Sequence, residues 1–169
     1  MRRSSTSTGR ATRRTTTSAT PDSNYFAYGA NLHIAQMKSL CPKSAPVCTA
    51  RLADYRLTIA LPASSPGNQP GWATVTPQEG AETPGALFRL HEEDLAALDH
   101  FEDYPALYDR IEVEIVTDEG PLRAMLYIMR HPIRAARPAA HYVETLRQGY
   151  RDFDLPMEVL EGVLGEAFS

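Results

Sequence analysis

Hydrophobic and polar residues alternate along a stretch in the second half of the chain. Ile111, Val113 and Ile115 are each separated by a glutamate, which is the two-residue period of a β-strand with one buried face. The turn sequence "TDEGP" follows, and the apolar stretch "LRAMLYIM" comes directly after it. This arrangement predicts a β-hairpin.

Four shorter stretches also have the composition of strands. "YFAY" is aromatic, and "YRLTIAL" alternates between apolar and polar side chains. The four predicted strands cover residues 25–28, 55–61, 72–76 and 86–90. Between the second and third lies "PASSPGNQPG" (62–71), whose Pro, Gly and Ser residues predict a loop, a candidate for bordering a site.

Helices are predicted between and after these strands. Asn31 is a suitable N-cap for a short helix that ends before Pro42. Acidic residues open "HEEDLAALDHFEDY", in which Leu95, Leu98 and Phe101 recur at helical spacing. The predicted helices cover residues 32–40, 91–104, 138–150 and a last segment that begins at Pro156. Strands in a meander with helices inserted predict an α+β fold with a curled or barrel-like sheet.

Composition divides the 169 residues into a short tail and one domain. The first twenty residues contain five arginines and no acid, and the rest are mostly Ser and Thr, a mixture that cannot bury enough apolar surface to fold. We therefore expect residues 1–23 to be a disordered tail and residues 24–169 to form a single domain. An organelle transit peptide is the alternative for the tail.

Charge and apolar content narrow the expected partners. Within residues 21–169, 12 of the 17 basic residues remain beside 21 acidic ones, a net charge of −9 that disfavours nucleic acid. No run of eighteen apolar residues occurs, so no membrane partner is expected. Cys41 and Cys48 have neither zinc-site nor redox-pair spacing and the five His residues are scattered. A cytoplasmic protein without a metal site is predicted.

Glu102 is the first candidate for chemistry. It follows Leu95 and Leu98 at spacings of three and four, so a continuous helix would place its carboxyl on the core side. Burial raises the pKa of a carboxyl group and makes it suitable as a general base or acid. The alternative is that the helix ends near Asp103 and Glu102 points into solvent.

The turn around Gly29 is the second candidate. A glycine between a strand and a helix lets the backbone approach a ligand and directs free N–H groups outward. "YGAN" lacks the flanking glycines and the lysine of a nucleotide-phosphate loop, so a small carboxylate is a better ligand than ATP. The alternative is a purely structural turn.

Three separated motifs resemble the gamma-glutamylcyclotransferase-like family. They are "YFAYGANL", then "LDHFEDYPALYDR", and finally "RPAAHYVETLRQGYRDFDLP". The resemblance covers residues 24–157 and implies a small mixed β-barrel with inserted and flanking helices. It also implies a cofactor-free enzyme, a monomer or small homo-oligomer, acting on a small-molecule gamma-glutamyl substrate.

The resemblance also assigns site residues. The family's catalytic glutamate, in the pattern Leu-Asp-x-x-Glu-Gly, falls on Glu102. Its Tyr-Gly-Ser-Asn-Leu turn and its two later tyrosines imply these substrate-binding residues: Tyr28, Gly29, Ala30, Asn31, Leu32, Tyr108 and Tyr142. Without the family match, structural roles are the better interpretation of the two later tyrosines: Tyr108 as a buried residue of a strand, and Tyr142 as a residue that packs a helix.

The chain departs from the family pattern at three positions. Ala30 replaces a serine in the turn, Asp103 replaces the glycine after the glutamate, and Ala139 replaces a serine of the late motif. Ala30 removes a hydroxyl but keeps its backbone N–H. Asp103 raises the pKa of Glu102 further if the two charges are close, or else faces water.

The implied reaction is an intramolecular cyclisation that releases 5-oxoproline and a free amine or amino acid, with Glu102 as general base and acid. Two alternatives remain: a gamma-glutamyl-ligand binding protein with little or no turnover, and an amidohydrolase, for which no nucleophile elbow or metal motif is present. Loop 62–71 and Arg130, Arg134 and Arg137 are candidates for shaping leaving-group preference, although a solvated basic face also explains the arginines.

Overall fold

The structure is a computed structural model that describes residues 22–169. Its sheet consists of six strands: β1 (Ser23–Ala27), β2 (Ala45–Pro62), β3 (Trp72–Leu90), β4 (Tyr108–Thr117), β5 (Gly120–Met129) and β6 (Ile133–Ala135). The helices are α1 (Ile34–Leu40), α2 (Leu95–Phe101), α3 (Ala140–Asp152) and α4 (Met157–Phe168), with short 3₁₀ turns η1 (Ala30–Leu32) and η2 (Glu92–Asp94). The expected tail lies outside the described residues except for its end, where Ser23 already pairs with Leu90.

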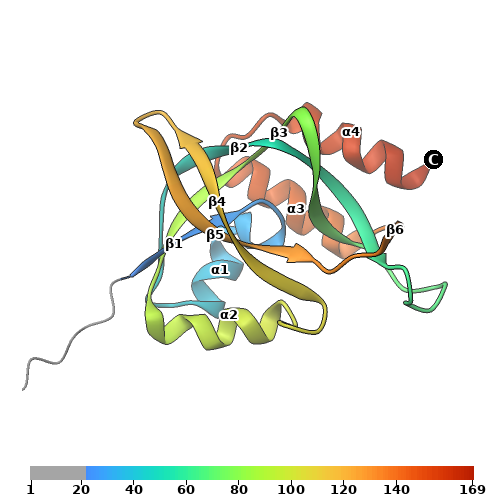
Figure 1. Cartoon of the computed structure of the whole chain (residues 1–169), viewed down its shortest axis with the longest axis horizontal. Helices are drawn as coiled ribbons and strands as arrows, with labels where there is room; N and C mark the ends of the chain where they lie inside the picture. Colours follow the sequence, from blue (N-terminus) through green and yellow to red (C-terminus); the bar gives the residue numbers. More distant parts are fainter. Residues whose placement is uncertain (1–21) are drawn as a thin grey trace, which may run out of the picture.

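Five of the strands close into a mixed barrel. Neighbours follow the order β3-β1-β5-β4-β2, and a long antiparallel pairing of β2 with β3 closes the ring, while β6 adds to β2. The barrel is mixed because β1 runs parallel to β5, with Tyr25 opposite Met125, and every other pair is antiparallel. The predicted α+β fold with a small mixed barrel is therefore confirmed (Figure 1).

The predicted strands 72–76 and 86–90 are one strand, and the strand predicted at 55–61 begins ten residues earlier. β3 continues through Pro77, Gly80 and Pro84, with an irregularity in its pairing to β2. At that point Asp54 and Gly80 both have positive φ, and the Gly80 N–H donates to the Asp54 carboxylate at 2.9 Å. The irregularity bends both strands, which allows so few strands to close a ring.

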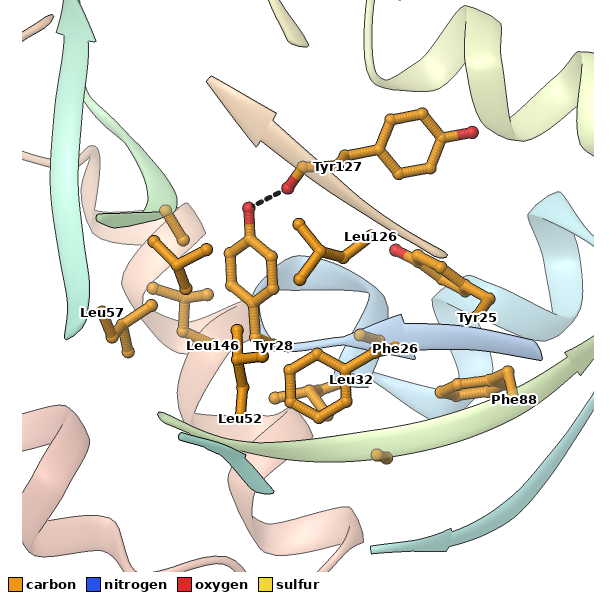
Figure 2. Close-up of a cluster of buried hydrophobic side chains, with 14 of the residues drawn as sticks. Tyr25, Phe26, Tyr28, Leu32, Leu52, Leu57, Phe88, Leu126, Tyr127 and Leu146 are labelled. Carbon is orange, nitrogen blue, oxygen red and sulfur yellow. Dashed lines mark hydrogen bonds between the residues drawn. The ribbon is translucent and has the colours of Figure 1, made fainter. Parts of the chain in front are cut away.

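The hairpin and the last two helices agree with their sequence patterns. β4 and β5 pair from Tyr108 with Met129 to Thr117 with Gly120, so the hairpin begins slightly before the alternating stretch. The helix α3 packs against η1 and α4, and α4 packs against β2 (Figure 1). Phe26, Leu32, Leu52, Phe88 and Leu126 belong to the shared core beneath these elements (Figure 2).

Two predicted helices differ in their boundaries. The first begins at Ile34, because the His33 side chain accepts the Gln36 N–H, whereas Asn31 lies in η1 and does not cap it. The second, α2, ends at Phe101 instead of residue 104, because Asp103 has a φ of 51° and cannot continue a right-handed helix. No helix of the described part has the length and apolar character needed to cross a membrane.

Candidate active site

A cavity of about 360 Å³ lies where the η1 turn, the end of α2, the start of β3 and the start of α3 meet. Its volume suits a small ligand. The residues that line it are Tyr25, Tyr28, Gly29, Ala30, Asn31, Gln36, Trp72, Ala73, Phe101, Glu102, Leu107, Tyr108, Tyr127, His141, Tyr142 and Thr145. They come from segments spread over 120 residues of sequence, so only the closed barrel assembles them.

Glu102 faces this cavity although the helix has already ended. It is the C-cap residue of α2, with φ of −83° and ψ of 0°, and its side chain turns back toward the η1 turn. The Asn31 Nδ2 donates to Glu102 Oε1 at 2.9 Å and also to the Tyr25 hydroxyl oxygen at 3.0 Å. The predicted helix end near Asp103 is therefore real, but it does not direct Glu102 into bulk solvent.

Burial among aromatic side chains raises the pKa of Glu102 to about 7, and the hydrogen bond from Asn31 opposes part of this shift. A carboxyl group with this pKa is present in both protonation states near neutral pH. It is therefore able to accept a proton and to return one within a single reaction cycle.

The raised pKa also predicts how Glu102 affects stability. The folded state keeps the Glu102 proton up to about pH 7, whereas the unfolded chain loses it near 4.5, so this group lowers stability as the pH rises from 4.5 to 7. We expect Glu102→Gln to be more stable than the native chain at pH 8, by up to about 3 kcal/mol, with that gain lost at pH 4. Urea unfolding at both pH values measures it; a gain that is independent of pH would contradict the assignment.

Tyr28 and Tyr108 use their hydroxyl protons within the protein, as Tyr127 of the same cavity also does through Asp99. The Tyr28 hydroxyl donates to the Tyr127 carbonyl oxygen, a contact drawn as a dashed line in Figure 2. The Tyr108 hydroxyl donates to the Ala73 carbonyl oxygen at 2.7 Å. Burial raises the pKa of both phenols well above the ordinary value, so they stay neutral and hold the cavity wall in place.

Tyr25 and Tyr142 differ, because each accepts a hydrogen bond without donating one to another residue of the 22–169 segment. Tyr25 accepts from Asn31, and Tyr142 accepts the Ala73 N–H at 2.9 Å. Within the same segment, no hydrogen bond uses the backbone N–H groups of Gly29, Ala30 and Asn31. The cavity therefore contains two free phenol donors and three free amides near the partly buried carboxyl group of Glu102.

The cavity brings together seven of the eight site residues predicted from sequence: Tyr28, Gly29, Ala30, Asn31, Glu102, Tyr108 and Tyr142. Leu32 is the exception, because it is fully buried in the core beneath the turn and does not line the cavity (Figure 2). Gly29 has an ordinary negative φ of −124°. Glycine is favoured at this position by close packing, because a Cβ on residue 29 would come within 3.1 Å of the Ala73 Cβ.

The three departures from the family pattern have different positions. Ala30 lines the cavity, so the missing serine hydroxyl is a change within the site. Asp103 is exposed, and its positive φ is one that aspartate tolerates better than most residues. Ala139 is the N-cap of α3 without a side-chain hydrogen bond, and it does not line the cavity. Two of the three departures therefore leave the cavity wall unchanged.

Several lining residues were not predicted. They are Tyr25, Gln36, Trp72, Ala73, Phe101, Leu107, Tyr127, His141 and Thr145. Tyr25 lies within the strand motif "YFAY", and Trp72 follows the predicted loop directly, but nothing in either stretch indicates that the two are neighbours. Tyr127 donates to Asp99 at 2.7 Å, which connects β5 to the helix that carries Glu102.

The candidate leaving-group determinants do not border the cavity. Arg130 contacts Asp109, and Arg137 donates to the Phe168 carbonyl oxygen. Arg134 donates to the carbonyl oxygens of Ser65 and Pro66 and so holds loop 62–71, which itself lies outside the cavity lining. Because none of the three arginines lines the cavity, the alternative of a solvated basic face is favoured over a role in leaving-group preference.

Residues 25–151 match the family model described as "Gamma-glutamyl cyclotransferase, AIG2-like". The chain is 31% identical to the human protein named gamma-glutamylcyclotransferase over 144 residues, covering 81% of this chain and 74% of that protein. The mouse protein of the same name is 28% identical over 141 residues, with the same coverage of 81% and 74%.

Solved structures agree with these sequence matches. A structure titled gamma-glutamyl cyclotransferase is similar with a TM-score of 0.75 and 28% identity, covering 84% of this chain and 86% of that one. The Bacillus subtilis protein YkqA shares the fold, with a TM-score of 0.71 and 21% identity over 88% of this chain and 55% of that one.

The fold and the cavity define a small mixed-barrel protein in which the partly buried carboxyl group of Glu102 faces a turn of free amides. This chain belongs to the gamma-glutamyl cyclotransferase, AIG2-like family. The family resemblance of the three sequence motifs is therefore confirmed.

Proposed function

We propose that this enzyme of the gamma-glutamylcyclotransferase type cyclises a gamma-glutamyl amide or dipeptide, with Glu102 as general base and general acid. The products are 5-oxoproline and a free amine or amino acid. The observation that supports the proposal most directly is the Glu102 carboxyl group, which lines the cavity, is partly buried and accepts a hydrogen bond from Asn31 of the turn. Further expectations are a cofactor-free, cytoplasmic protein that is a monomer or small homo-oligomer.

The reaction begins with the α-ammonium group of the substrate, which transfers one proton to the Glu102 carboxylate. The resulting amine attacks the γ-carbonyl carbon, so that a carbon–nitrogen bond forms and closes a five-membered ring. The bond from that carbon to the leaving nitrogen then breaks as Glu102 returns its proton to that nitrogen. The ring nitrogen loses its second proton, and the departing amine takes up one from solvent, so the sum requires neither water as a reactant nor an oxidant.

The free donors of the cavity suit the glutamyl part of such a substrate. An α-carboxylate and a γ-carbonyl oxygen both require hydrogen-bond donors, and the carbonyl oxygen gains negative charge as the ring closes. The amides of Gly29, Ala30 and Asn31 and the hydroxyls of Tyr25 and Tyr142 are available for these two groups. Tyr28 and Tyr108 shape the same space while their own protons are held by the backbone.

Most of the rate enhancement is expected from holding the substrate in a folded conformation. Well-oriented intramolecular attack is equivalent to effective molarities of about 10⁵ to 10⁸ M. Proton transfer by Glu102 adds roughly a further 10² to 10⁴-fold.

Incubation of the purified full-length protein with a panel of gamma-glutamyl amides and dipeptides tests the proposal. Mass spectrometry should detect 5-oxoproline in time-dependent amounts that are proportional to enzyme concentration. Release of free glutamate instead would indicate an amidohydrolase. Binding of the panel by calorimetry without any product would indicate a binding protein.

A further inference from the structure

The helix α2, which is followed directly by Glu102, is short and is anchored mainly at its beginning. It has seven residues, of which Leu98 is buried. The segment before it is held through Asp94, whose carboxylate accepts the Lys43 backbone N–H at 2.9 Å and the Ser44 hydroxyl at 2.7 Å. These contacts fix the start of the helix, so the position of Glu102 depends on what holds the other end.

Asp99, one turn before Glu102, supplies contacts at that other end. Its Oδ1 accepts the Tyr127 hydroxyl at 2.7 Å, and its Oδ2 lies 3.5 Å from Arg110 Nη1. Arg110 and Tyr127 are directly opposite each other on β4 and β5, so their side chains project from the same face of the hairpin. Two adjacent strands of the barrel therefore hold one carboxylate of the helix.

Both partners of this carboxylate are themselves fixed. The Tyr127 ring is buried and packs edge-on against Tyr25 and Tyr104, with ring centroids 5.9 Å and 6.5 Å away. The Tyr127 backbone carbonyl accepts the Tyr28 hydroxyl (Figure 2). The Arg110 guanidinium lies over the Tyr104 ring at 4.2 Å. Side chains whose own conformations are locked by packing are the ones that hold a neighbouring group precisely.

The backbone around Glu102 is bonded to the same part of the helix. The Asp99 carbonyl oxygen accepts the Tyr104 N–H at 2.9 Å, and the Leu98 carbonyl oxygen accepts the Glu102 N–H at 3.0 Å. A shift of Asp99 would therefore move the chain on both sides of Glu102.

Asp99 has no direct access to a substrate in the cavity. Neither Asp99 nor Arg110 lines it, whereas Tyr127 lines it and gives its hydroxyl proton to Asp99. Any effect of Asp99 on the reaction must therefore act through the position of Glu102.

We infer that Asp99 is a positioning residue: its carboxylate, held by Tyr127 and Arg110, fixes the end of α2 so that the Glu102 carboxyl group stays beside the η1 turn. This inference rests on the proposed function of Glu102 as general base and acid. A misplacement of ~1 Å in a reacting group can lower the rate about 10²-fold. The amides of η1 that suit the substrate are not held by Asp99, so loss of these contacts should lower kcat more than it raises KM.

Tyr127→Phe is the most direct test, because it removes the hydroxyl that Asp99 accepts and keeps the ring in the cavity wall. We expect kcat to fall about 10- to 100-fold while KM stays within about threefold of the native value, measured as 5-oxoproline release. An unchanged kcat overturns the inference. A raised KM with unchanged kcat also overturns it, because the hydroxyl would then act on the substrate itself.

Variants of Asp99 provide the matched series. Asp99→Ala should lower kcat at least as much as Tyr127→Phe, and the double variant should fall no further than Asp99→Ala, because both changes remove the same interaction. Asp99→Asn keeps an oxygen that accepts the Tyr127 hydroxyl and should recover most of the loss. His100→Ala, an exposed change in the same helix, should leave turnover unchanged. Losses that multiply in the double variant would overturn the inference.

A measurement that needs no turnover separates this inference from the proposed function. Four phenols around Glu102 stay neutral because burial raises the pKa of each: Tyr25, Tyr28, Tyr108 and Tyr142. Tyr127→Phe changes no charge, and Asp99, Arg110 and His141 are present in every protein compared. A change in the titration of Glu102 therefore reports a change in its own burial.

The measurement is the stability gained by Glu102→Gln at pH 8 relative to pH 4, from urea unfolding in the native and Tyr127→Phe backgrounds. We expect a smaller gain in Tyr127→Phe, because a displaced Glu102 reaches water and its pKa falls toward the ordinary value. An undiminished gain overturns the inference, even if Asp99→Ala does not fold. A diminished gain in a protein that releases no 5-oxoproline overturns the proposed function and leaves the placement of Glu102 by Asp99 intact.

Discussion

Glu102→Gln should lower the turnover of a gamma-glutamyl substrate by about 10² to 10⁴-fold while the protein remains folded. Glutamine has the same length as glutamate and keeps an oxygen that can accept the Asn31 N–H, which bonds to Glu102 at 2.9 Å. It cannot accept the ammonium proton of the substrate or return it to the leaving nitrogen. Single-turnover measurement of 5-oxoproline, with circular dichroism as the test of folding, measures this loss.

The neighbouring Asp103 supplies a matched control. Asp103→Asn makes the same change from carboxylate to amide one residue away, at an exposed position whose positive φ asparagine also tolerates. We expect its turnover to equal that of the native chain.

The native kcat/KM should also rise with pH through about 7, as the Glu102 carboxyl group ionises, and this rise should be absent in Glu102→Gln. Full activity in Glu102→Gln would remove Glu102 from the mechanism.

Gly149→Ala should destabilise the protein and weaken catalysis together, although Gly149 does not touch the cavity. Gly149 lies where α3 crosses the η1 turn, and a Cβ there would come within 2.5 Å of the Leu32 Cβ and 2.9 Å of the His33 backbone nitrogen. A backbone atom cannot rotate away as the end of a flexible side chain can, so the whole η1 turn has to shift to make room for the added Cβ. Overpacking of this kind costs about 1–3 kcal/mol, which outweighs the gain of up to ~1 kcal/mol in helix propensity.

The functional part of this prediction follows from the shared turn. Displacement of η1 shifts the free amides of Ala30 and Asn31, and a misplacement of ~1 Å in a positioning group can lower the rate about 10²-fold. Gly162→Ala is the control, because Gly162 lies in α4 with no atom within 4 Å of the added Cβ. We expect it to raise the free energy of unfolding by about 0.5–1 kcal/mol without changing turnover. Equal stabilisation by both substitutions would show that α3 and the turn are not tightly packed.

Local patterns predicted most elements but misplaced boundaries where tertiary contacts compete with them. The hairpin was predicted well because its alternation and its turn are both local. The long strand β3 was predicted as two shorter strands, whereas pairing with β2 along its length continues it through Pro77 and Gly80. Asn31 was assigned as a helix cap because its side chain suits that role, but its oxygen accepts from the Gln36 side chain and its Nδ2 donates to Glu102 and Tyr25 instead.

The candidate site was identified from sequence to the extent that its residues lie in recognisable motifs. Glu102 and the residues around Gly29 were found in this way, and the cavity contains them. Leu32 was included because it belongs to the motif, yet its side chain packs into the core. Tyr25 and Tyr127 lie in ordinary strand sequences, so no local signal distinguishes them from core aromatics.

The amino-acid sequence by itself determined the alternating strands, the amphipathic helices, the turn at Gly29 and the identity of the acid at Glu102. Only the tertiary structure decided that Glu102 faces the cavity after its helix has ended, and that Tyr25 and Tyr142 keep free hydroxyl protons while Tyr28 and Tyr108 do not. The physical reason is distance along the chain. The hydrogen-bond partners of Tyr28, Tyr108 and Tyr142 are 35 to 99 residues away along the chain, and burial that raises a pKa exists only once the barrel has closed.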